Sequence, residues 1–444
     1  MPDSRRPIEI DDLYNLIFVA DPNISPDGAR VAWVATTVDR NKNGYRSSIW
    51  IAPSDGSEAP YRFTGGTGKD TSPRWSPDGS QIAFLSDRSG KNQVWVIPVD
   101  GGEAWQVTDG PNAASEIGWM PDGASIYYTT KVEPEEGDER KSDTRVITTL
   151  RYKADGEGFL DNKRRHIFAA SVDGGESRPL TSGDFDCSQP AVSPDGRYLA
   201  CMSNRSDDNR NNSLSDIWVT DLHNNESRRV TPEDGNYSTP AWSTSGEVAF
   251  VGHPIVEPYG PSTLDNLYTW SPDTDEINGL LVGIDREPGN GAIADARYGV
   301  PTQPPIWSSD GSQVYTLLSD RGSVDIYTCP ASGNPSSLAG GQRDIQSFTV
   351  ANDGTISFAA STMQLPTEVF VRRPDGSETQ LSHHNDDFIN GIELGSIEEV
   401  TFESDPGVEI HGWLLRPPAF NADAKYPAIL EIHGGPHGMY GVGF

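Results

Sequence analysis

Cysteine is scarce in this sequence of 444 residues, which has only Cys187, Cys201 and Cys329. None of the three lies in a Cys-x-x-Cys pair, and three thiols cannot build a disulfide framework for a chain of this length. The scarcity favours a reducing compartment. We expect Cys187 and Cys201 to be small buried side chains.

Long hydrophobic runs are also missing. Near the N-terminus, the apolar segment from Leu13 to Ala20 is short, contains Asn15, follows Asp11 and Asp12, and has no clear cleavage site, so it does not read as a signal peptide. No other segment is long or apolar enough to span a membrane. We therefore expect a cytoplasmic protein without membrane association.

Positive charge is in short supply. The chain has 34 Lys and Arg residues against 65 Asp and Glu, and its formal net charge is -31. Such a surface repels polyanions, which argues against nucleic acid and anionic lipid as partners.

The basic residues are mostly Arg, and this allows two interpretations of the acidic surface. One is adaptation to a salty habitat or cytoplasm, and the other is a surface kept soluble by its charge. The first predicts different unfolding temperatures at low and at molar salt. Equal temperatures would contradict it.

Glycine and proline are abundant, with 45 and 34 residues, and 35% of the chain is hydrophobic. This mixture is typical of a soluble protein with many short strands joined by turns, and no helical class fits it. The length allows two or three ordinary domains, or one large repetitive domain with an addition.

The stretch from Arg74 to Phe84 predicts a strand, a turn and a second strand. Its turn is Ser-Pro-Asp-Gly, in which Pro77 presets φ, Asp78 tolerates the third turn position and Gly79 takes a positive φ. Versions of this turn recur, with wear in the later copies, at residues 25–28, 76–79, 120–123, 193–196, 243–246, 308–311 and 351–354.

Each repeat spans roughly 40 to 70 residues and offers about four short strands. Such a small sheet cannot bury both faces alone, so neighbouring units must stack face to face. Radial stacking predicts an all-β, seven-bladed β-propeller. Eight blades are the main alternative, because residues 259–295 could hide extra strands, and an open solenoid would need capping repeats that the sequence lacks.

We expect three regions: an N-terminal helical segment over residues 1–22, the propeller over 23–392, and the truncated beginning of an α/β-hydrolase domain over 393–444. The helix is expected within Ile8–Phe18, where acidic residues precede apolar ones at helical spacing. In the last region, residues 397–417 predict a hairpin. Lys425–Ile432 predicts a buried apolar strand.

That strand leads directly into His433-Gly434-Gly435. A buried strand that delivers His-Gly-Gly into a loop is what an α/β-hydrolase uses for one wall of its oxyanion hole. We expect the Gly435 N–H to be the oxyanion donor, with Gly434 and His433 shaping the loop. The alternative is an ordinary glycine-rich turn.

These features together resemble the prolyl oligopeptidase family of serine peptidases, in particular its acylaminoacyl-peptidase-like branch. The resemblance covers nearly the whole chain and rests on the repeated turns, the hairpin ending Gly412-Trp413-Leu414 with Pro417, and His433-Gly434-Gly435-Pro436-His437-Gly438. The segment Arg151-Tyr152-Lys153-Ala154-Asp155-Gly156 through His166-Ile167-Phe168 is also similar to that branch.

The resemblance implies a Ser hydroxyl that is activated by His and attacks the scissile carbonyl, followed by hydrolysis of the acyl-enzyme. It implies no metal and no organic cofactor. In this family the catalytic Ser, Asp and His lie mostly C-terminal to the oxyanion loop. No Gly-x-Ser-x-Gly occurs in the sequence. We therefore expect no catalytic residue within the 444 residues and no hydrolysis by them alone.

The leading hypothesis is that the complete protein hydrolyses short peptides, N-acylated ones among the candidates. The alternatives are a non-catalytic binding propeller and an esterase of the same hydrolase fold. The residue preference, exo- or endo-cleavage and homo-oligomer formation stay open.

Three further groups of residues invite a site but have simpler interpretations. His383 and His384 with Asp386 and Asp387 suggest a metal site, although a polar loop explains them better. His433 and His437 have metal-like spacing only on a helix, which the intervening Gly and Pro forbid. An acidic run could collect a peptide's amino group, although a solvated loop is the simpler interpretation; it contains Glu133, Glu135, Glu136, Asp138 and Glu139.

Overall fold

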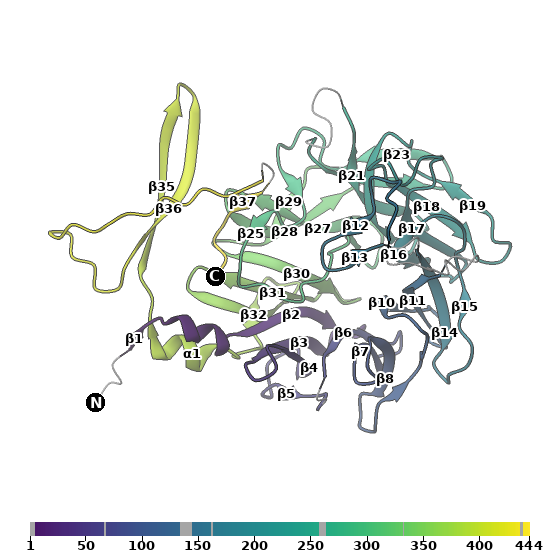
Figure 1. The fold of residues 1–444 in the computed structure, drawn as a ribbon, viewed down its shortest axis with the longest axis horizontal. Helices are drawn as coiled ribbons and strands as arrows, with labels where there is room; N and C mark the ends of the chain where they lie inside the picture. Colours follow the sequence, from purple (N-terminus) through teal and green to yellow (C-terminus); the bar gives the residue numbers. More distant parts are fainter. Residues whose placement is uncertain are drawn as a thin grey trace.

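The computed structural model describes residues 5–65, 68–133, 144–160, 163–256, 263–331, 333–435 and 438–444. Strands dominate this part of the chain. Its sheets follow one another around a common centre, which brings the first sheet against the last (Figure 1). The fold is a β-propeller, as the repeated turns predict.

Five sheets in the described part of the chain have four antiparallel strands each. The first contains β2 (Ile17–Ile24), β3 (Arg30–Asp39), β4 (Gly44–Pro53) and β5 (Tyr61–Arg62). The second contains β6 (Asp70–Trp75), β7 (Gln81–Ser86), β8 (Gln93–Pro98) and β9 (Trp105–Gln106). The third contains β10 (Ala114–Trp119), β11 (Ser125–Val132), β14 (Arg164–Ser171) and β15 (Arg178–Pro179).

The fourth sheet contains β16 (Cys187–Val192), β17 (Tyr198–Ser203), β18 (Asp216–Asp221) and β19 (Ser227–Arg229). The fifth contains β20 (Gly235–Trp242), β21 (Val248–Pro254), β22 (Asn266–Ser271) and β23 (Glu276–Gly279). The stretch 259–295, which could have hidden extra strands under the eight-blade alternative, supplies the outer strands β22 and β23 of this sheet in its described part, followed by the short β24 (Glu287–Pro288) and β25 (Ala292–Ile293).

A larger sheet of nine strands completes the ring. It contains two consecutive antiparallel runs that are joined by one parallel pair, Val324 with Asp344. The first run is β26 (Ile306–Trp307), β27 (Gln313–Asp320), β28 (Ser323–Pro330) and β29 (Ser336–Ala339), with β24 added beside β27. The second is β30 (Asp344–Val350), β31 (Ile356–Thr362), β32 (Leu365–Arg372) and β33 (Glu378–Gln380).

The repeated turn has the structure that its sequence predicts. In the copy at Ser76–Gly79, Gly79 has φ +71° and its N–H donates to Ser76 O at 2.9 Å. Ser76 Oγ donates to Asp78 Oδ1 at 2.6 Å and accepts from Gln81 N at 2.9 Å. Asp78 also accepts from Ser80 N, so this one carboxylate organises the turn and starts the next strand.

Tryptophans at the starts of the repeats tie each sheet to the one before it. The indole N–H of Trp75 donates to Asn23 O in β2 at 2.8 Å, and that of Trp119 donates to Arg74 O in β6 at 2.9 Å. Trp242 and Trp307 make the equivalent bonds to residues 191 and 241. These side chains also pack in or against the core clusters. Because each indole also donates to a neighbouring sheet, it fixes how the two sheets stack.

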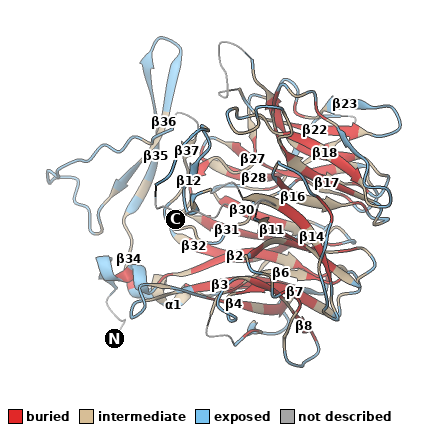
Figure 2. Ribbon diagram, turned by 45° about the vertical axis from the view of Figure 1, so that its right-hand side comes forward, coloured by how far each residue is buried: buried red, intermediate tan, exposed pale blue. Residues whose placement is uncertain are grey.

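The strands of the ring are largely buried (Figure 2), and the core lies between the sheets, where buried residues of neighbouring units form common clusters. Between the first two sheets, Ile49 and Ile51 from β4 pack against Ile82 and Phe84 from β7, and all four are essentially unexposed. Burying each such side chain contributes about 1.5–3 kcal/mol. Face-to-face stacking therefore supplies the stability that no single four-stranded sheet has.

The ring is closed by side-chain hydrogen bonds between β2 and the segment that follows β33, because the first and last sheets, in the part of the chain that the structure describes, are not paired with each other. Asn385 Oδ1 accepts from Ile17 N, and Asn385 Nδ2 donates to Ile17 O, both at 3.0 Å. Asn385 is in turn held by Glu368 Oε1, which accepts from its backbone N–H at 2.8 Å. Nearby, β1 (Arg6–Pro7) pairs in parallel with β34 (Ile392–Glu393), which follows the short helix α1 (Asp386–Gly391).

The structure differs from the sequence predictions at both ends of the chain. The short helix expected within Ile8–Phe18 forms only over Ile10–Tyr14, as the 3-10 helix η1, because Ile17 and Phe18 belong to β2 and pair with β3. The strand expected at Lys425–Ile432 does not form, because no strand in the described residues lies beside it. Its Ile429, Leu430 and Ile432 are 78–95% exposed.

Residues 393–444 form no α/β-hydrolase sheet in the part that is described. They contain the hairpin of β35 (Ser396–Asp405) and β36 (Val408–Arg416), which was predicted, and the short β37 (Met439–Tyr440). Most of the hairpin projects from the ring (Figure 2), and Trp413 of β36 lies against Gly322 in the β27–β28 turn. No helix among the described residues is long and apolar enough to cross a membrane.

His384 lies where the first and last sheets meet. Trp33 Nε1 donates to His384 Nε2 at 3.0 Å, and the Trp50 ring lies edge-on at 4.7 Å between centroids. Burial, with a smaller effect from His383, lowers the pKa of His384 to about 4. A protonated Nε2 could not accept the indole N–H, so the closed ring requires the neutral imidazole.

This contact predicts that lowering the pH weakens the fold. The unfolded chain protonates this histidine at about pH 6.5, but the folded chain does so only near pH 4. Between these values the unfolded state binds more protons, so the contribution is fully present above pH 6.5. On the order of 3 kcal/mol is lost as the pH falls to about 4. The free energy of unfolding in urea should fall less between pH 7.5 and pH 4.5 in His384→Gln than in the parent chain. An equal fall in both would refute the role of His384 in this pH dependence.

Candidate functional site

The predicted oxyanion loop is a short exposed turn made of His433, Gly434 and Gly435. His433 Nδ1 donates to Gly434 O at 2.8 Å, and the His433 ring lies edge-on to Tyr440 at 5.5 Å. Gly435 has φ +152°, a conformation that side chains rarely adopt. Among the hydrogen bonds of the described residues, none is donated by the Gly435 N–H. The other two residues of the motif, Pro436 and His437, lie outside the described residues.

The chain that follows this loop is anchored to the propeller. β37 pairs in parallel with β25, matching Met439 to Ala292 and Tyr440 to Ile293. Val442 is 4% exposed, and its N–H donates to Gly322 O in the β27–β28 turn at 2.9 Å. This attachment begins at Met439, directly after Gly438, and thus limits where the His-Gly-Gly loop can lie.

The C-terminal segment contacts one end of the ring at the nine-stranded sheet and at β25. In each four-stranded run the second strand turns back into the third at this end, whereas the repeated Ser-Pro-Asp-Gly turns lie at the other end. β37 meets the β27–β28 turn, and Gln364 in the β31–β32 turn lies 3.5 Å from Gly395 O. We call this end the C-terminal face.

Two sequence models of known domains match the chain. The acylaminoacyl-peptidase N-terminal β-propeller domain matches residues 132–366, which is more than half of the chain. The chain belongs to the acylaminoacyl-peptidase family. The N-terminal β-propeller domain of tricorn protease also matches, over residues 44–148.

Relatives of this acylaminoacyl-peptidase family member are peptidases. The uncharacterized peptidase YuxL of Bacillus subtilis is 32% identical over 98% of this chain and 67% of its own length. Dipeptidyl-peptidase 5 of Porphyromonas endodontalis is 26% identical over 93% of this chain and 60% of its own length. The chain thus spans between three fifths and two thirds of these two relatives.

Solved structures share the fold. The uncomplexed acylaminoacyl peptidase of Pyrococcus horikoshii superposes with a TM-score of 0.75 at 22% identity, over 97% of this chain and 62% of that one. At this identity the match shows a common propeller architecture and no more.

In this member of the acylaminoacyl-peptidase family, the two adjacent histidines do not converge on one point. His384 Nε2 accepts the Trp33 indole N–H, whereas His383 Nδ1 lies 3.0 Å from Asp386 on the exposed side. No group of three or more His, Cys, Asp or Glu in the described residues is placed to hold a metal ion. The interpretation of His383 and His384 as a polar loop fits these separate partners, with His384 buried against tryptophans.

The acidic run and the cysteines were the other candidates. Glu133 pairs with Lys163 at 2.6 Å, and the remaining members, Glu135, Glu136, Asp138 and Glu139, lie outside the described residues. Cys187 and Cys201 are free and buried, as predicted.

Gly322 permits the hairpin to approach the ring. It has φ +84°, and a Cβ at this position would overlap the indole of Trp413 in β36. We expect Gly322→Ala to cost about 1 kcal/mol through the positive φ alone and to displace Trp413 as well. Limited proteolysis should then cut within 396–416 faster than in the parent chain. Gly412→Ala is the matched control, because its Cβ would meet nothing within 4 Å; equal cutting of both variants would contradict this contact.

Proposed function

We propose that this chain is the propeller portion of a serine peptidase that hydrolyses short peptides, N-acylated ones among them. The observation that carries the proposal is the order of parts, in which a propeller of this family is followed by a His433-Gly434-Gly435 loop whose Gly435 N–H donates to no group in the described part of the chain. The peptidases YuxL and dipeptidyl-peptidase 5, which align with nearly the whole chain, support it.

We propose a propeller of seven blades. Five four-stranded sheets and the two four-stranded runs of the nine-stranded sheet support this number among the described residues. The repeated turns fall once in each of these seven units. The third and fourth units are enlarged on the C-terminal face, by residues 144–160 of the β11–β14 connection and by the β17–β18 loop.

In the proposed mechanism, the chain contributes an oxyanion donor. A backbone N–H that points into the site can bind the oxygen on which negative charge develops, and it needs no reorganisation during the reaction. Gly435 is assigned this role, and His433 and Gly434 shape the loop. The nucleophilic Ser, the His and the Asp are assigned to sequence C-terminal to residue 444. No metal or organic cofactor is required for this chemistry.

The propeller's proposed role is to limit which molecules reach the site. The oxyanion loop is assigned to the C-terminal face of the propeller. The propeller would therefore cover one side of the active site, admitting short peptides and excluding folded proteins. We propose a cytoplasmic location. Because the surface is strongly acidic, nucleic acid is not expected as a partner.

Turnover assays on the native protein test this function. N-acetyl-alanine p-nitroanilide and the matching p-nitrophenyl ester should both be hydrolysed, and a fluorophosphonate should stop both reactions. Hydrolysis of the ester alone would indicate an esterase. Absence of both would favour a binding propeller. The 444-residue chain alone is expected to hydrolyse neither.

A further inference from the structure

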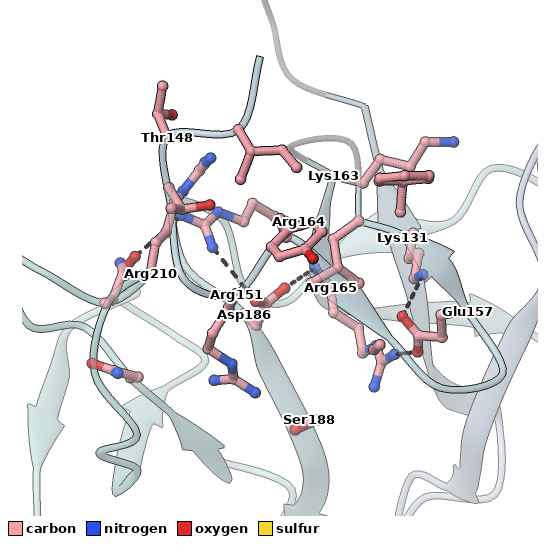
Figure 3. A pocket seen from close by; sticks show the side chains of 18 of the residues that line it. Lys131, Thr148, Arg151, Glu157, Lys163, Arg164, Arg165, Asp186, Ser188 and Arg210 are labelled. Atoms are coloured by element: carbon pink, nitrogen blue, oxygen red, sulfur yellow. Dashed lines mark hydrogen bonds and ion pairs between the residues drawn. The ribbon is translucent and has the colours of Figure 1, made fainter. Parts of the chain in front are cut away.

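A pocket of about 680 Å³ opens between the third and fourth sheets. Its walls come from the end of β11, residues 144–160 and 163–165, the start of β16 and the β17–β18 loop (Figure 3). This volume suits a small organic ligand or a few peptide residues rather than a single ion. Apolar side chains, including those of Ile147, Phe159 and Leu214, line part of it beside the polar groups.

The charge of the pocket is opposite to that of the protein. Seven Lys and Arg residues line it against two carboxylates, in a chain with a net charge of -31. Two more carboxylates, Glu133 and Asp184, pair with its cations from outside the lining. Positive charge therefore remains in excess after every described partner is counted, which makes an anionic ligand the complementary one.

Ion pairs fix several of these cations in place. Glu157 binds both Lys131, at 2.7 Å, and Arg165. Arg164 donates to Asp184 at 2.8 Å and lies 3.5 Å from Asp186, and its side chain is only 13% exposed. These bonds hold the wall rigid (Figure 3), and a rigid wall loses little entropy when a ligand binds.

Two lining cations are more available to a ligand. Arg151 is exposed, and no ion pair of its guanidinium is among those of the described residues. Among the ion pairs of the described residues, Lys163 has one, with Glu133, whose side chain is 62% exposed, and such exposed pairs contribute little. An incoming carboxylate can therefore bind Arg151 without breaking an ion pair of the described residues. It can also replace Glu133 at Lys163 with little loss of free energy.

The pocket lies on the same face of the ring as the oxyanion loop. The β11–β14 and β17–β18 connections that form its walls are second-to-third strand connections, like the β27–β28 turn that β37 contacts. A peptide bound on the C-terminal face could thus reach both places. The repeated Ser-Pro-Asp-Gly turns, by contrast, lie at the far end.

We propose that this pocket binds a carboxylate of a peptide, either its free C-terminus or an acidic side chain, through Arg151 and Lys163. The choice of a peptide over other anions rests on the proposed peptidase function. Arg and Lys make charge-assisted hydrogen bonds to carboxylates, and Arg can do so with two parallel bonds. The apolar lining would then contact the neighbouring residues of the peptide.

Isothermal titration of the 444-residue chain tests this site without requiring catalysis. The probes are N-acetyl-trialanine with a free C-terminal carboxylate, its C-terminal amide, and the amide of N-acetyl-Ala-Glu-Ala. We expect the free acid or the Glu peptide to bind at least about tenfold more tightly than the plain amide, as expected for hydrogen bonds to a charged group. The tighter of the two identifies the source of the carboxylate, and 0.5 M NaCl should weaken it.

Variants locate the binding. Arg151→Gln and Lys163→Gln should each weaken the preferred peptide about tenfold and leave the plain amide unchanged. Arg30→Gln is the control with the same charge change, because Arg30 follows a repeated turn at the opposite end and lies 3.4 Å from the exposed Asp100. The proposal would be overturned if the free acid, the Glu peptide and the plain amide bound with equal affinity. It would also be overturned if Arg30→Gln lost as much affinity for the preferred peptide as the two pocket variants. If the native protein hydrolyses peptides but the pocket shows either of these results, the proposed peptidase function holds and only the carboxylate site is rejected.

Discussion

Replacing Gly435 with proline is expected to lower the kcat for peptide hydrolysis by the native protein by about 10²–10³-fold, the usual effect of removing one oxyanion-hole donor. Proline has no backbone N–H, and its φ is fixed near -65°, far from the +152° of Gly435. KM should change little, because the lost interaction forms only as charge develops on the substrate oxygen.

Gly434→Ala separates this loss from general disturbance of the loop. A Cβ at Gly434 would meet nothing within 4 Å, and its N–H is retained. We expect its kcat to stay within a few-fold of the parent. A Gly435→Pro enzyme with unchanged kcat would remove Gly435 from the oxyanion hole, and equal losses in the two variants would show that the loop only has a structural role.

Asn385→Ala is expected to give the largest loss of stability, about 3 kcal/mol. The substitution removes the two hydrogen bonds that join Asn385 to Ile17 and a third from Asn385 Nδ2 to Glu368 Oε1 at 3.1 Å. It leaves the buried Glu368 with fewer hydrogen-bond donors. It also removes the side-chain hydrogen bonds that join β2 to the segment after the last sheet. Unpaired buried groups of this kind cost about 1–3 kcal/mol each.

Urea unfolding followed by far-UV circular dichroism measures this effect. Asn390→Ala, on an exposed position of the adjacent helix α1, should change the free energy of unfolding by less than about 0.5 kcal/mol. A loss below 1 kcal/mol for Asn385→Ala would mean that packing of β2 against β30 and β32 closes the ring without these bonds.

The sequence predicted the parts of this fold that depend on local chemistry. Pro77, Asp78 and Gly79 specify their turn within four residues, so each copy of the turn marks a unit, and stacking follows from the small size of the sheets. The bridging role of Trp75 was not predictable, because its partner Asn23 lies 52 residues away and is reached through the backbone. Only packing of one unit on the next brings them together.

The errors come from segments whose local pattern fits two structures. Ile17 and Phe18 continue a helical spacing, but pairing with Thr37 and Thr36 in β3 places them in a strand. Lys425–Ile432 has the composition of a buried strand, yet a strand requires neighbours that the described residues do not supply.

The candidate site was predictable only in part. The His433-Gly434-Gly435 motif identified the loop, but nothing local indicates that β37 would tie it to β25. The sequence did not predict the basic pocket, because its cations are spread from Lys131 to Arg210 in a strongly acidic chain. The only signal for it was the insertion after β11, which enlarges the third repeat.

The most direct test of the central claim, that this propeller works as part of a serine peptidase, is fluorophosphonate labelling of lysate from the native source. An antibody against the propeller captures the protein, and intact mass with peptide mapping locates the label. We predict a labelled Ser on a species clearly heavier than the 48.2 kDa of this chain. A captured protein of 48.2 kDa that carries no label would contradict the claim and leave a propeller that only binds.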